Sequence, residues 1–210
     1  MNFLIKPKKN GNILATIVIG KKFYNNWFKF SYPSWKLYCK KNQLGLVCFK
    51  TDIISKKDPK WKKATWQKLL IADKLKQSNF KINNVCYLDS DILINYMNSP
   101  NIFDFYKENK IGLVSEIFNL PYELSVVKKL LSFYRNFYYD KKYPLNSSIF
   151  MTPKEIFDYH KLKKFNNYAC MGLILFNIKN HSNIMKNIFF NYQKNIKTIT
   201  GGGDETILNY

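Results

Sequence analysis

Short runs of apolar residues recur along the chain and alternate with segments of helical periodicity. The apolar runs are typical of strands that are covered on both faces of a sheet. They predict strands at residues 12–19, 44–49, 85–88, 110–116 and 168–177. Helical spacing predicts helices at residues 26–41, 61–76, 101–106 and 182–194. This alternation favours an α/β fold with a mixed, mostly parallel central sheet flanked by helices.

Single residues predict two of the helix boundaries. Pro33 interrupts residues 26–41, and it is expected to end one helix and to start the next. Asn180 or Ser182 is expected to cap the helix over residues 182–194, because short polar side chains satisfy free N–H groups at helix starts.

The chain of 210 residues fits one domain of ordinary globular composition. Hydrophobic residues make up 46% of it and aromatic residues 17%. Residues 119–165 are rich in aromatic residues and lysine, and they contain no motif to which chemistry can be assigned. We expect a single domain over residues 1–210, with an insertion at 119–165 that faces an acceptor or a partner.

A strong positive charge narrows the range of partners. Lys and Arg number 34 against 14 Asp and Glu, and the net charge of +20 favours nucleotides, nucleic acid or an anionic membrane. Lysine is abundant throughout and Arg135 is the only arginine, so compositional bias also explains part of the charge. The scarcity of arginine argues against specific nucleic-acid binding, which uses bidentate contacts.

The spacing of the cysteines and the N-terminal sequence help to predict the cellular compartment of the protein. The cysteines lie far apart, at Cys39, Cys48, Cys86 and Cys170. Such spacing is typical of small buried residues in a reduced compartment and does not predict a zinc site. The apolar run at residues 13–19 is too short for a signal peptide or a membrane span. A cytoplasmic protein is expected, and peripheral attachment to an anionic membrane stays open.

Two aspartates follow the apolar run at residues 85–88. Asp89 and Asp91 are separated by Ser90, and apolar residues come directly after them. Desolvating unpaired carboxylates costs roughly several kcal/mol each, so a cationic partner is expected. Mg²⁺ or Mn²⁺ fits, because both prefer oxygen ligands and keep positions open for phosphates. The alternative is that the acids cap a turn or pair with lysines.

The end of the first predicted strand supplies further candidates. Ligands of open α/β sheets bind at the carboxyl ends of the strands, so nucleotide contacts are expected there. The candidates are Thr16, Gly20, Lys21 and Tyr24. Residues 21–24 are expected to form the loop at this end, and the alternative for Tyr24 is an ordinary core or surface aromatic residue.

One lysine stands out in the helix predicted over residues 61–76. Lys68 lies within an apolar stripe that also contains Ile71 and Leu75, and it is a candidate for a phosphate or sugar contact. Its alternative role is to snorkel, with the stem packed and the ammonium in water. The other lysines of the segment are expected to be solvated: Lys62, Lys63, Lys74 and Lys76.

A glycine turn near the end of the sequence places two acids at an expected helix start. Residues 201–203 are glycines, and Asp204 and Glu205 follow them. Helix capping explains Asp204 without any catalysis.

Several segments together carry a resemblance to a known family: residues 12–20, Lys68 with Leu69, residues 87–91, Met171 with Gly172, and residues 202–209. In this order they resemble nucleotide-sugar glycosyltransferases of the GT-A type, most of all the retaining family 8 group that includes glycogenin. The resemblance spans nearly the whole chain except the insertion. It implies a Rossmann-like GT-A domain that moves a hexose from a nucleotide-diphosphate sugar, expected to be a UDP-sugar, to a glycan, protein or lipid acceptor.

The resemblance also implies how the donor is bound. Asp91 is expected to coordinate Mn²⁺ or Mg²⁺ on the donor diphosphate, and Asp89 is expected to contact both the metal and the ribose. Ser90 and Gly172 are expected to complete the donor site.

The catalytic residues that the resemblance implies are Lys68, Asp204 and Glu205. Lys68 is expected to meet the donor phosphate or sugar, where a cation stabilises the departing diphosphate. Asp204 and Glu205 are expected to lie near the transferred sugar, whose anomeric centre becomes cation-like.

The chain departs from the family pattern at three places. Cys170 stands where the family often has an asparagine that binds the sugar. Glu205 stands where the family commonly has glutamine, so a general-base role and an inverting outcome stay open beside the favoured retaining one. A third metal ligand, a histidine beyond the glycine turn, has no counterpart, because His160 and His181 lie elsewhere. Either the sequence is a fragment or water replaces this ligand.

Two other functions are weighed against this one. A haloacid-dehalogenase-like phosphatase also has an Asp-x-Asp after a strand, with the first Asp as nucleophile. Two predicted strands precede Asp89, however, and Leu208 stands where that class needs an acid. A basic nucleic-acid-binding domain would explain the charge but not the paired acids.

Overall fold

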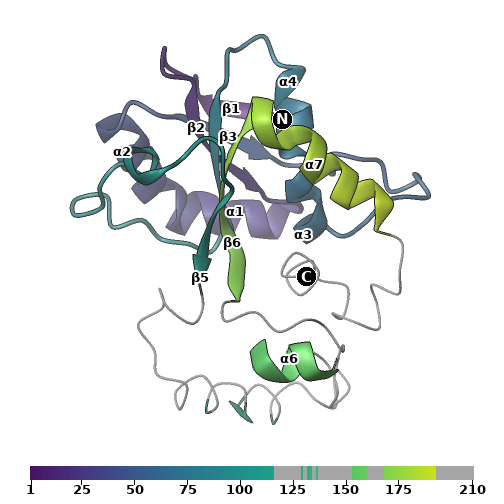
Figure 1. Ribbon diagram of the computed structural model, residues 1–210. Coiled ribbons are helices and arrows are strands. Elements are labelled where there is room, and N and C mark those ends of the chain that lie inside the picture. The colour runs from purple at the N-terminus through teal and green to yellow at the C-terminus, as the bar shows by residue number, and fades with distance from the viewer. Residues whose placement is uncertain (116–128, 130–131, 134–135, 137–152, 160–167, 193–210) are drawn as a thin grey trace. The chain divides into compact units, whose positions relative to one another are not determined.

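The computed structural model describes residues 1–115, 129, 132–133, 136, 153–159 and 168–192 (Figure 1). The chain divides into two compact units, one made of Met1–Leu113 with Gly172–Tyr192 and the other of Val114–Met171 with Gln193–Tyr210. The first unit contains Asp89 and Asp91 together with the strands that position them.

A mixed six-stranded sheet organises the chain, in the order β1-β3-β2-β4-β6-β5. Its strands are β1 (Asn2–Ile5), β2 (Asn12–Ile17), β3 (Gly45–Phe49), β4 (Asn84–Leu88), β5 (Gly112–Ser115) and β6 (Ala169–Asn177). β2 pairs in parallel with β3 and β4, whereas β1 is antiparallel to β3, and β6 is antiparallel to β4. The α/β fold with a mixed sheet is as predicted, and β1 adds a strand that the sequence pattern does not predict.

The parallel strands are apolar because both of their faces are covered. Every residue of β3 and β4 is buried, and Leu14 of β2 lies in register with Leu46 on one side and Cys86 on the other. β2 ends at Ile17, earlier than the predicted end, although the N–H of Val18 still donates to a β3 carbonyl. Because β2 runs parallel to β3 and to β4, the carboxyl ends of these three strands lie at the same end of the sheet. We call this end the carboxyl edge.

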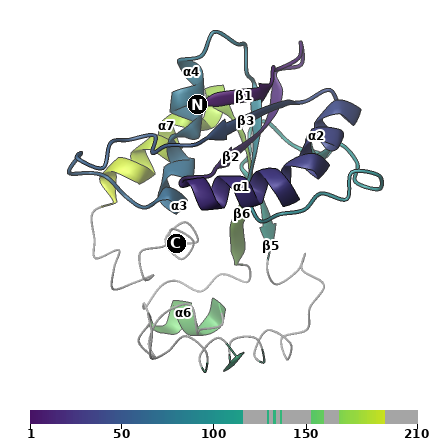
Figure 2. The same cartoon turned by 180° about the vertical axis from the view of Figure 1, so that it is seen from behind.

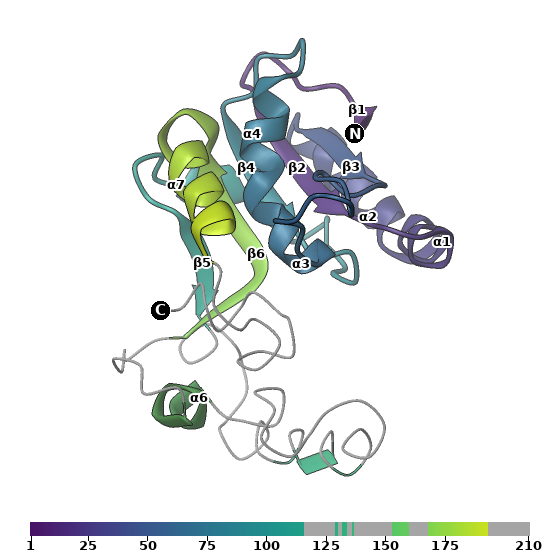
Figure 3. The same ribbon diagram turned by 90° about the vertical axis from the view of Figure 1, so that its right-hand side faces the viewer.

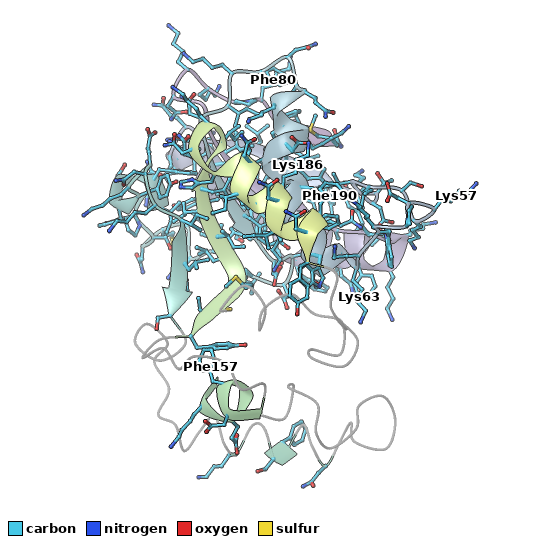
Figure 4. All side chains as sticks on the ribbon, turned by 45° about the vertical axis from the view of Figure 1, so that its right-hand side comes forward. Lys57, Lys63, Phe80, Phe157, Lys186 and Phe190 are labelled. Atoms are coloured by element: carbon cyan, nitrogen blue, oxygen red, sulfur yellow. The ribbon has the colours of Figure 1, made fainter. Side chains whose placement is uncertain are left out.

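Helices cover both faces of this sheet. The helical segments are α1 (Lys21–Phe30), α2 (Tyr32–Lys41), α3 (Ala64–Gln67), η1 (Lys68–Leu70), α4 (Ile71–Lys76), η2 (Ile102–Phe105), α6 (Pro153–Tyr159) and α7 (Ile178–Asn191). Figure 2 shows α1 and α2 on one face, and Figure 3 shows α4 and α7 on the other. On that second face, Lys186 of α7 (labelled in Figure 4) donates to both carboxylate oxygens of Asp73 at 3.1 Å.

The face under α1 and α2 holds a core of large aromatic side chains. Trp27 and Trp35 are 2% and 0% exposed, and their rings meet edge to face at 5.7 Å. They pack in one buried cluster with Leu14 of β2 and Leu88 of β4. Burial of two tryptophans against the central strands fixes α1 and α2 to the carboxyl half of the sheet.

Two helix starts differ from the predicted ones. Residues 21–24 form the first turn of α1 and not a loop, because Gly20 has a φ of 104° and turns the chain directly into the helix. α7 begins at Ile178, and its cap is Asn177, whose side chain accepts from the N–H of Asn180 at 3.0 Å. The prediction of Asn180 or Ser182 as cap is wrong, since the last residue of β6 already caps the helix. Pro33 lies in the first turn of α2, as predicted.

Lys62 is buried, which contradicts its predicted exposure. Its side chain is 7% exposed, and its ammonium donates to the carbonyl of Phe189 in the last turn of α7. Burial lowers the pKa of Lys62 below its ordinary value. A carbonyl at a helix end compensates part of the desolvation of the ammonium. Lys63 and Lys76 are exposed, as predicted.

Three of the four cysteines are buried, as predicted. Cys39, Cys48 and Cys86 are buried, Cys170 is half-buried, and none of the four forms a disulfide. Burial raises the pKa of Cys39 to about 12 and that of Cys48 to about 11, so both stay protonated at neutral pH. Within the described part of the chain no helix is long and apolar enough to cross a membrane.

Most of the predicted insertion at residues 119–165 lies outside the described residues. Within it, residues 129, 132–133 and 136 are helical, and α6 adds a helix that the sequence pattern does not predict.

Candidate functional site

The acid pair lies at the tip of β4, at the carboxyl edge of the sheet. β4 ends at Leu88, and Asp89 follows as the first residue beyond the strand. The N–H of Asp89 donates to the carbonyl of Gly172 in β6 at 2.8 Å. The structure therefore brings Gly172 and Asp89 together, two residues that the sequence assigns to one donor site.

Lys68, Tyr87 and Asp89 form a connected row. The phenol of Tyr87 donates to Oδ1 of Asp89 at 2.6 Å. The Nζ of Lys68 lies 5.2 Å from the centre of the Tyr87 ring, and the two side chains are 2% and 3% exposed. A buried ammonium is thus linked through an aromatic ring to the first carboxylate of the pair. Lys68 therefore lies next to a neighbour of Asp89, and its contact with a donor phosphate or sugar stays a prediction.

Asp91 faces a cavity on the α1 side. Its side chain is exposed, and it lines a cavity of about 300 Å³. The other lining residues are Phe23, Asn26, Trp27, Phe30, Ser31, Ser90 and Leu93. Four of the lining side chains are apolar and four are polar, so the cavity can take a ligand with both kinds of surface.

The start of α2 holds the loop that carries Asp91. Ser31 Oγ donates to the carbonyl of Ser90 at 2.9 Å, and Trp35 Nε1 donates to the carbonyl of Ile92 at 2.9 Å. The N–H of Ile94 donates to Ser34 Oγ at 3.3 Å. Side chains that bind backbone atoms fix the path of a loop, so Asp91 is presented on a defined turn.

The same helix holds the loop further on. Lys41 Nζ donates to the carbonyls of Tyr96, Met97 and Ser99 at 3.0 to 3.2 Å. Tyr38 bridges this loop by donating to one carbonyl and accepting from the N–H of Ile102, each at 2.8 Å. Sequence reasoning missed these supporting residues. Their signal is a helical stripe of side chains with hydrogen-bonding atoms: Ser31, Ser34, Trp35, Tyr38 and Lys41.

The remaining donor candidates surround the end of β2. Thr16 is fully buried, and its hydroxyl has no hydrogen-bond partner among the described residues. Gly20 and Lys21 are exposed at the start of α1. Tyr24 is half-buried, and Lys50 Nζ lies 3.9 Å from the centre of its ring. Thr16 and Tyr24 therefore lie on opposite sides of the turn at Gly20, one inside the sheet and one on the helix.

Asp204 and Glu205 lie outside the described residues. Their expected place near the transferred sugar stays a prediction.

Comparison with known proteins identifies the fold. Neither the protein-family models nor the curated proteins match this chain. Among solved structures, the chain is similar to the crystal structure of a glycosyltransferase involved in the glycosylation of the major capsid of PBCV-1. The match has a TM-score of 0.53 and 10% sequence identity, and it covers 94% of this chain and 75% of that chain. The chain has a glycosyltransferase fold.

The acid pair of this glycosyltransferase fold suits a cation that shares its ligands with a substrate. Asp89 and Asp91 offer carboxylate oxygens, and Ser90 between them offers a hydroxyl. Mg²⁺ commonly binds one or two carboxylates, with substrate phosphates and water as its other ligands. Within the described residues no group of three His, Cys, Asp or Glu side chains is placed to hold a metal. A metal held by Asp89 and Asp91 would therefore need further ligands from a substrate or from water.

A larger hollow of about 590 Å³ lies at the opposite edge of the sheet. Glu108 and Asn177 are among its lining residues, and both bind the side chain of Asn84 at 2.8 Å. These contacts tie β4, β6 and the segment after η2 together. Because ligands of such sheets bind at the carboxyl ends of the parallel strands, Asp89 and Asp91 remain the candidate site and the hollow at the opposite end does not.

Replacing Trp35 with phenylalanine should loosen the Asp91 loop. The change removes the hydrogen bond to Ile92 and part of a fully buried side chain, so stability should fall by about 1–3 kcal/mol. Amide hydrogen exchange of residues 90–94 should become faster. Trp61→Phe is the matched control, because the Trp61 indole donates to Asp52 and not to this loop. Unchanged exchange of residues 90–94 in Trp35→Phe would show that Trp35 does not hold the loop.

Proposed function

We propose that the protein is a metal-dependent glycosyltransferase that moves a hexose from a nucleotide-diphosphate sugar, first of all a UDP-sugar, to a glycan, protein or lipid acceptor. The observation that carries the proposal is the position of Asp89 and Asp91 at the carboxyl end of β4 in a glycosyltransferase fold. Ligands of open α/β sheets bind at this edge, and an acid pair is the donor set that a cation on a diphosphate needs.

Asp91 and Asp89 would hold Mn²⁺ or Mg²⁺ against the diphosphate. The metal, when bound, would neutralise negative charge on the departing nucleotide diphosphate. Asp91 lines the open cavity, and its exposed carboxylate is accessible to a substrate there. Asp89 is held by Tyr87, whose phenol fixes one of its carboxylate oxygens and thereby orients the other.

Lys68 would supply a fixed positive charge to the same leaving group. During transfer the bond from the anomeric carbon to the diphosphate breaks, and its electron pair stays on the phosphate oxygen. A buried ammonium stabilises this charge more strongly than an exposed one, because the surroundings of Lys68 hold little water. The Tyr87 ring lies under the ammonium, with Nζ 5.2 Å from the ring centre, and helps to position it.

Asp204 and Glu205 would act on the sugar. The anomeric carbon gains positive charge as the diphosphate leaves, and a nearby carboxylate stabilises it. We favour retention of configuration, as in the retaining family 8 group that the sequence resembles. The glutamate at position 205 keeps a general-base role, and with it inversion, as the competing outcome.

Isothermal titration calorimetry tests the proposal. The protein is titrated with UDP-glucose, UDP-galactose, UDP-N-acetylglucosamine and GDP-mannose, each in the presence of Mn²⁺ and again in the presence of a chelator. We expect binding of at least one donor that disappears on chelation. If none of these donors binds in a metal-dependent way, the proposed function is wrong.

A further inference from the structure

The rim of the cavity beside Asp91 exposes large apolar side chains. Phe23, Phe30 and Leu93 line the cavity and are 65%, 61% and 66% exposed, and we call them the apolar rim. Phe23 and Phe30 lie seven residues apart on α1, which places them on the same side of the helix. Clustered exposed apolar side chains of this size mark a surface that binds another apolar surface, such as that of a protein or a membrane.

The rest of α1 is basic and aromatic. Trp27 is its buried residue, and it anchors the helix to the sheet. Lys21, Lys22 and Lys29 are exposed along the helix. An aromatic side with lysines beside it is the pattern of helices that lie in the interface of a lipid bilayer.

The segment that carries α1 and α2 contains no acid, and the acid that this face does hold, Asp91, lies in the cavity. Residues 1–51 contain no aspartate or glutamate, and Asp52 is the first acidic residue of the chain. The lysines of α1 and α2 are all exposed: Lys21, Lys22, Lys29, Lys36, Lys40 and Lys41. Compositional bias toward lysine does not by itself explain the lack of acids here. On the opposite face, by contrast, Lys186 pairs with Asp73.

We propose that α1 and Leu93 form a docking surface for an anionic lipid bilayer. The apolar rim enters the interfacial layer, and Lys22 and Lys29 contact the lipid phosphates. Lysine is depleted in the centres of protein interfaces, whereas basic aromatic helices are common at membranes, so a bilayer fits this surface better than a protein does. The proposal rests on the proposed function in one respect, because it implies that the acceptor used at the Asp91 site is held at the membrane surface.

Vesicle flotation tests the docking without any donor sugar. The protein is mixed with vesicles of phosphatidylcholine alone or with phosphatidylglycerol, at low and at high salt. We expect it to float with the anionic vesicles, less so at high salt, and to stay behind with neutral vesicles. Failure to float with anionic vesicles at low salt would overturn the proposal.

Paired variants separate the two parts of the surface. The double variant Phe23→Ser and Phe30→Ser, and the double variant Lys22→Ser and Lys29→Ser, should each lower the partition coefficient on the order of 10-fold. Ile184→Ser is the control for the first, because Ile184 is 53% exposed on α7, across the sheet from α1 (Figure 3). The control for the second is Lys76→Ser with Lys179→Ser, which removes exposed lysines of α4 and α7.

Two further measurements decide between the possible occupants of the surface. Equal losses in the control variants would show that flotation reflects net charge and not this surface. If the wild type is a dimer that the double phenylalanine variant dissociates, the surface binds a second copy and the proposal is overturned. Asp91→Asn should float like the wild type. Calorimetry with donors uses no vesicles, so failure of the proposed function and failure of the docking are seen separately.

Discussion

Replacing Asp91 with asparagine is expected to abolish metal-dependent donor binding and to lower transfer by about 1000-fold or more. Asparagine keeps the shape of the side chain but removes its charge, and a neutral amide is a poor ligand for Mn²⁺ or Mg²⁺. The loop itself should stay in place, because Ser31 and Trp35 hold it through backbone carbonyls and not through Asp91. Calorimetry and a transfer assay measure the loss, and thermal denaturation should show an unchanged transition.

Asp104→Asn is the control for this variant. Asp104, on η2, is another exposed aspartate of the same unit, and its carboxylate accepts from the side chain of Asn101, the residue that caps η2. The Asp104→Asn protein should bind donors and metal as the wild type does. Metal-dependent binding that survives in Asp91→Asn would remove this residue from the metal site.

Replacing Lys68 with methionine is expected to lower transfer by about 100-fold while leaving Mn²⁺ binding in place. Methionine is an unbranched apolar side chain that suits a buried position, so the main change is loss of the ammonium over the Tyr87 ring. The turnover number should fall more than the donor affinity, because the charge of the leaving group is greatest in the transition state. Steady-state kinetics with varied donor concentration separate the two effects.

Lys74→Met serves as the matched control for Lys68. Lys74 lies on α4 and its ammonium donates to Gln77 at 3.0 Å, away from Tyr87. This variant should keep wild-type kinetics. If Lys68→Met unfolds more easily but each folded molecule transfers sugar at the wild-type rate, Lys68 is a structural residue and not a catalytic one.

The strands could be predicted because burial on both faces requires continuous apolar runs. This requirement identified β2, β3, β4 and β6 to within a few residues. The start of α1 could not be predicted in the same way, since it depends on a φ of 104° at Gly20, which the residue type allows but does not require. The burial of Lys62 was missed because its partner carbonyl, on Phe189, is distant in the sequence.

Part of the candidate site could also be predicted from the pattern of apolar and charged residues. Two acids after an apolar run, together with the family resemblance, singled out Asp89 and Asp91. The expected desolvation does not apply to Asp91, because β4 ends at Leu88 and the Asp91 side chain is exposed. The link from Lys68 through Tyr87 follows from strand alternation, because Tyr87 and Asp89 are two residues apart. The role of α2 could not be predicted, since it arises from packing between Trp35 and a loop that lies far along the chain.

The metal site at Asp89 and Asp91 can be tested in a crystal structure of the protein grown with UDP and Mn²⁺. Anomalous difference density locates the manganese independently of the rest of the map. We expect one strong peak at coordination distance, about 2.0–2.3 Å, from carboxylate oxygens of Asp89 and Asp91 and from the diphosphate. Bound UDP with manganese elsewhere, for example beside Glu108 at the opposite edge of the sheet, would contradict this expectation.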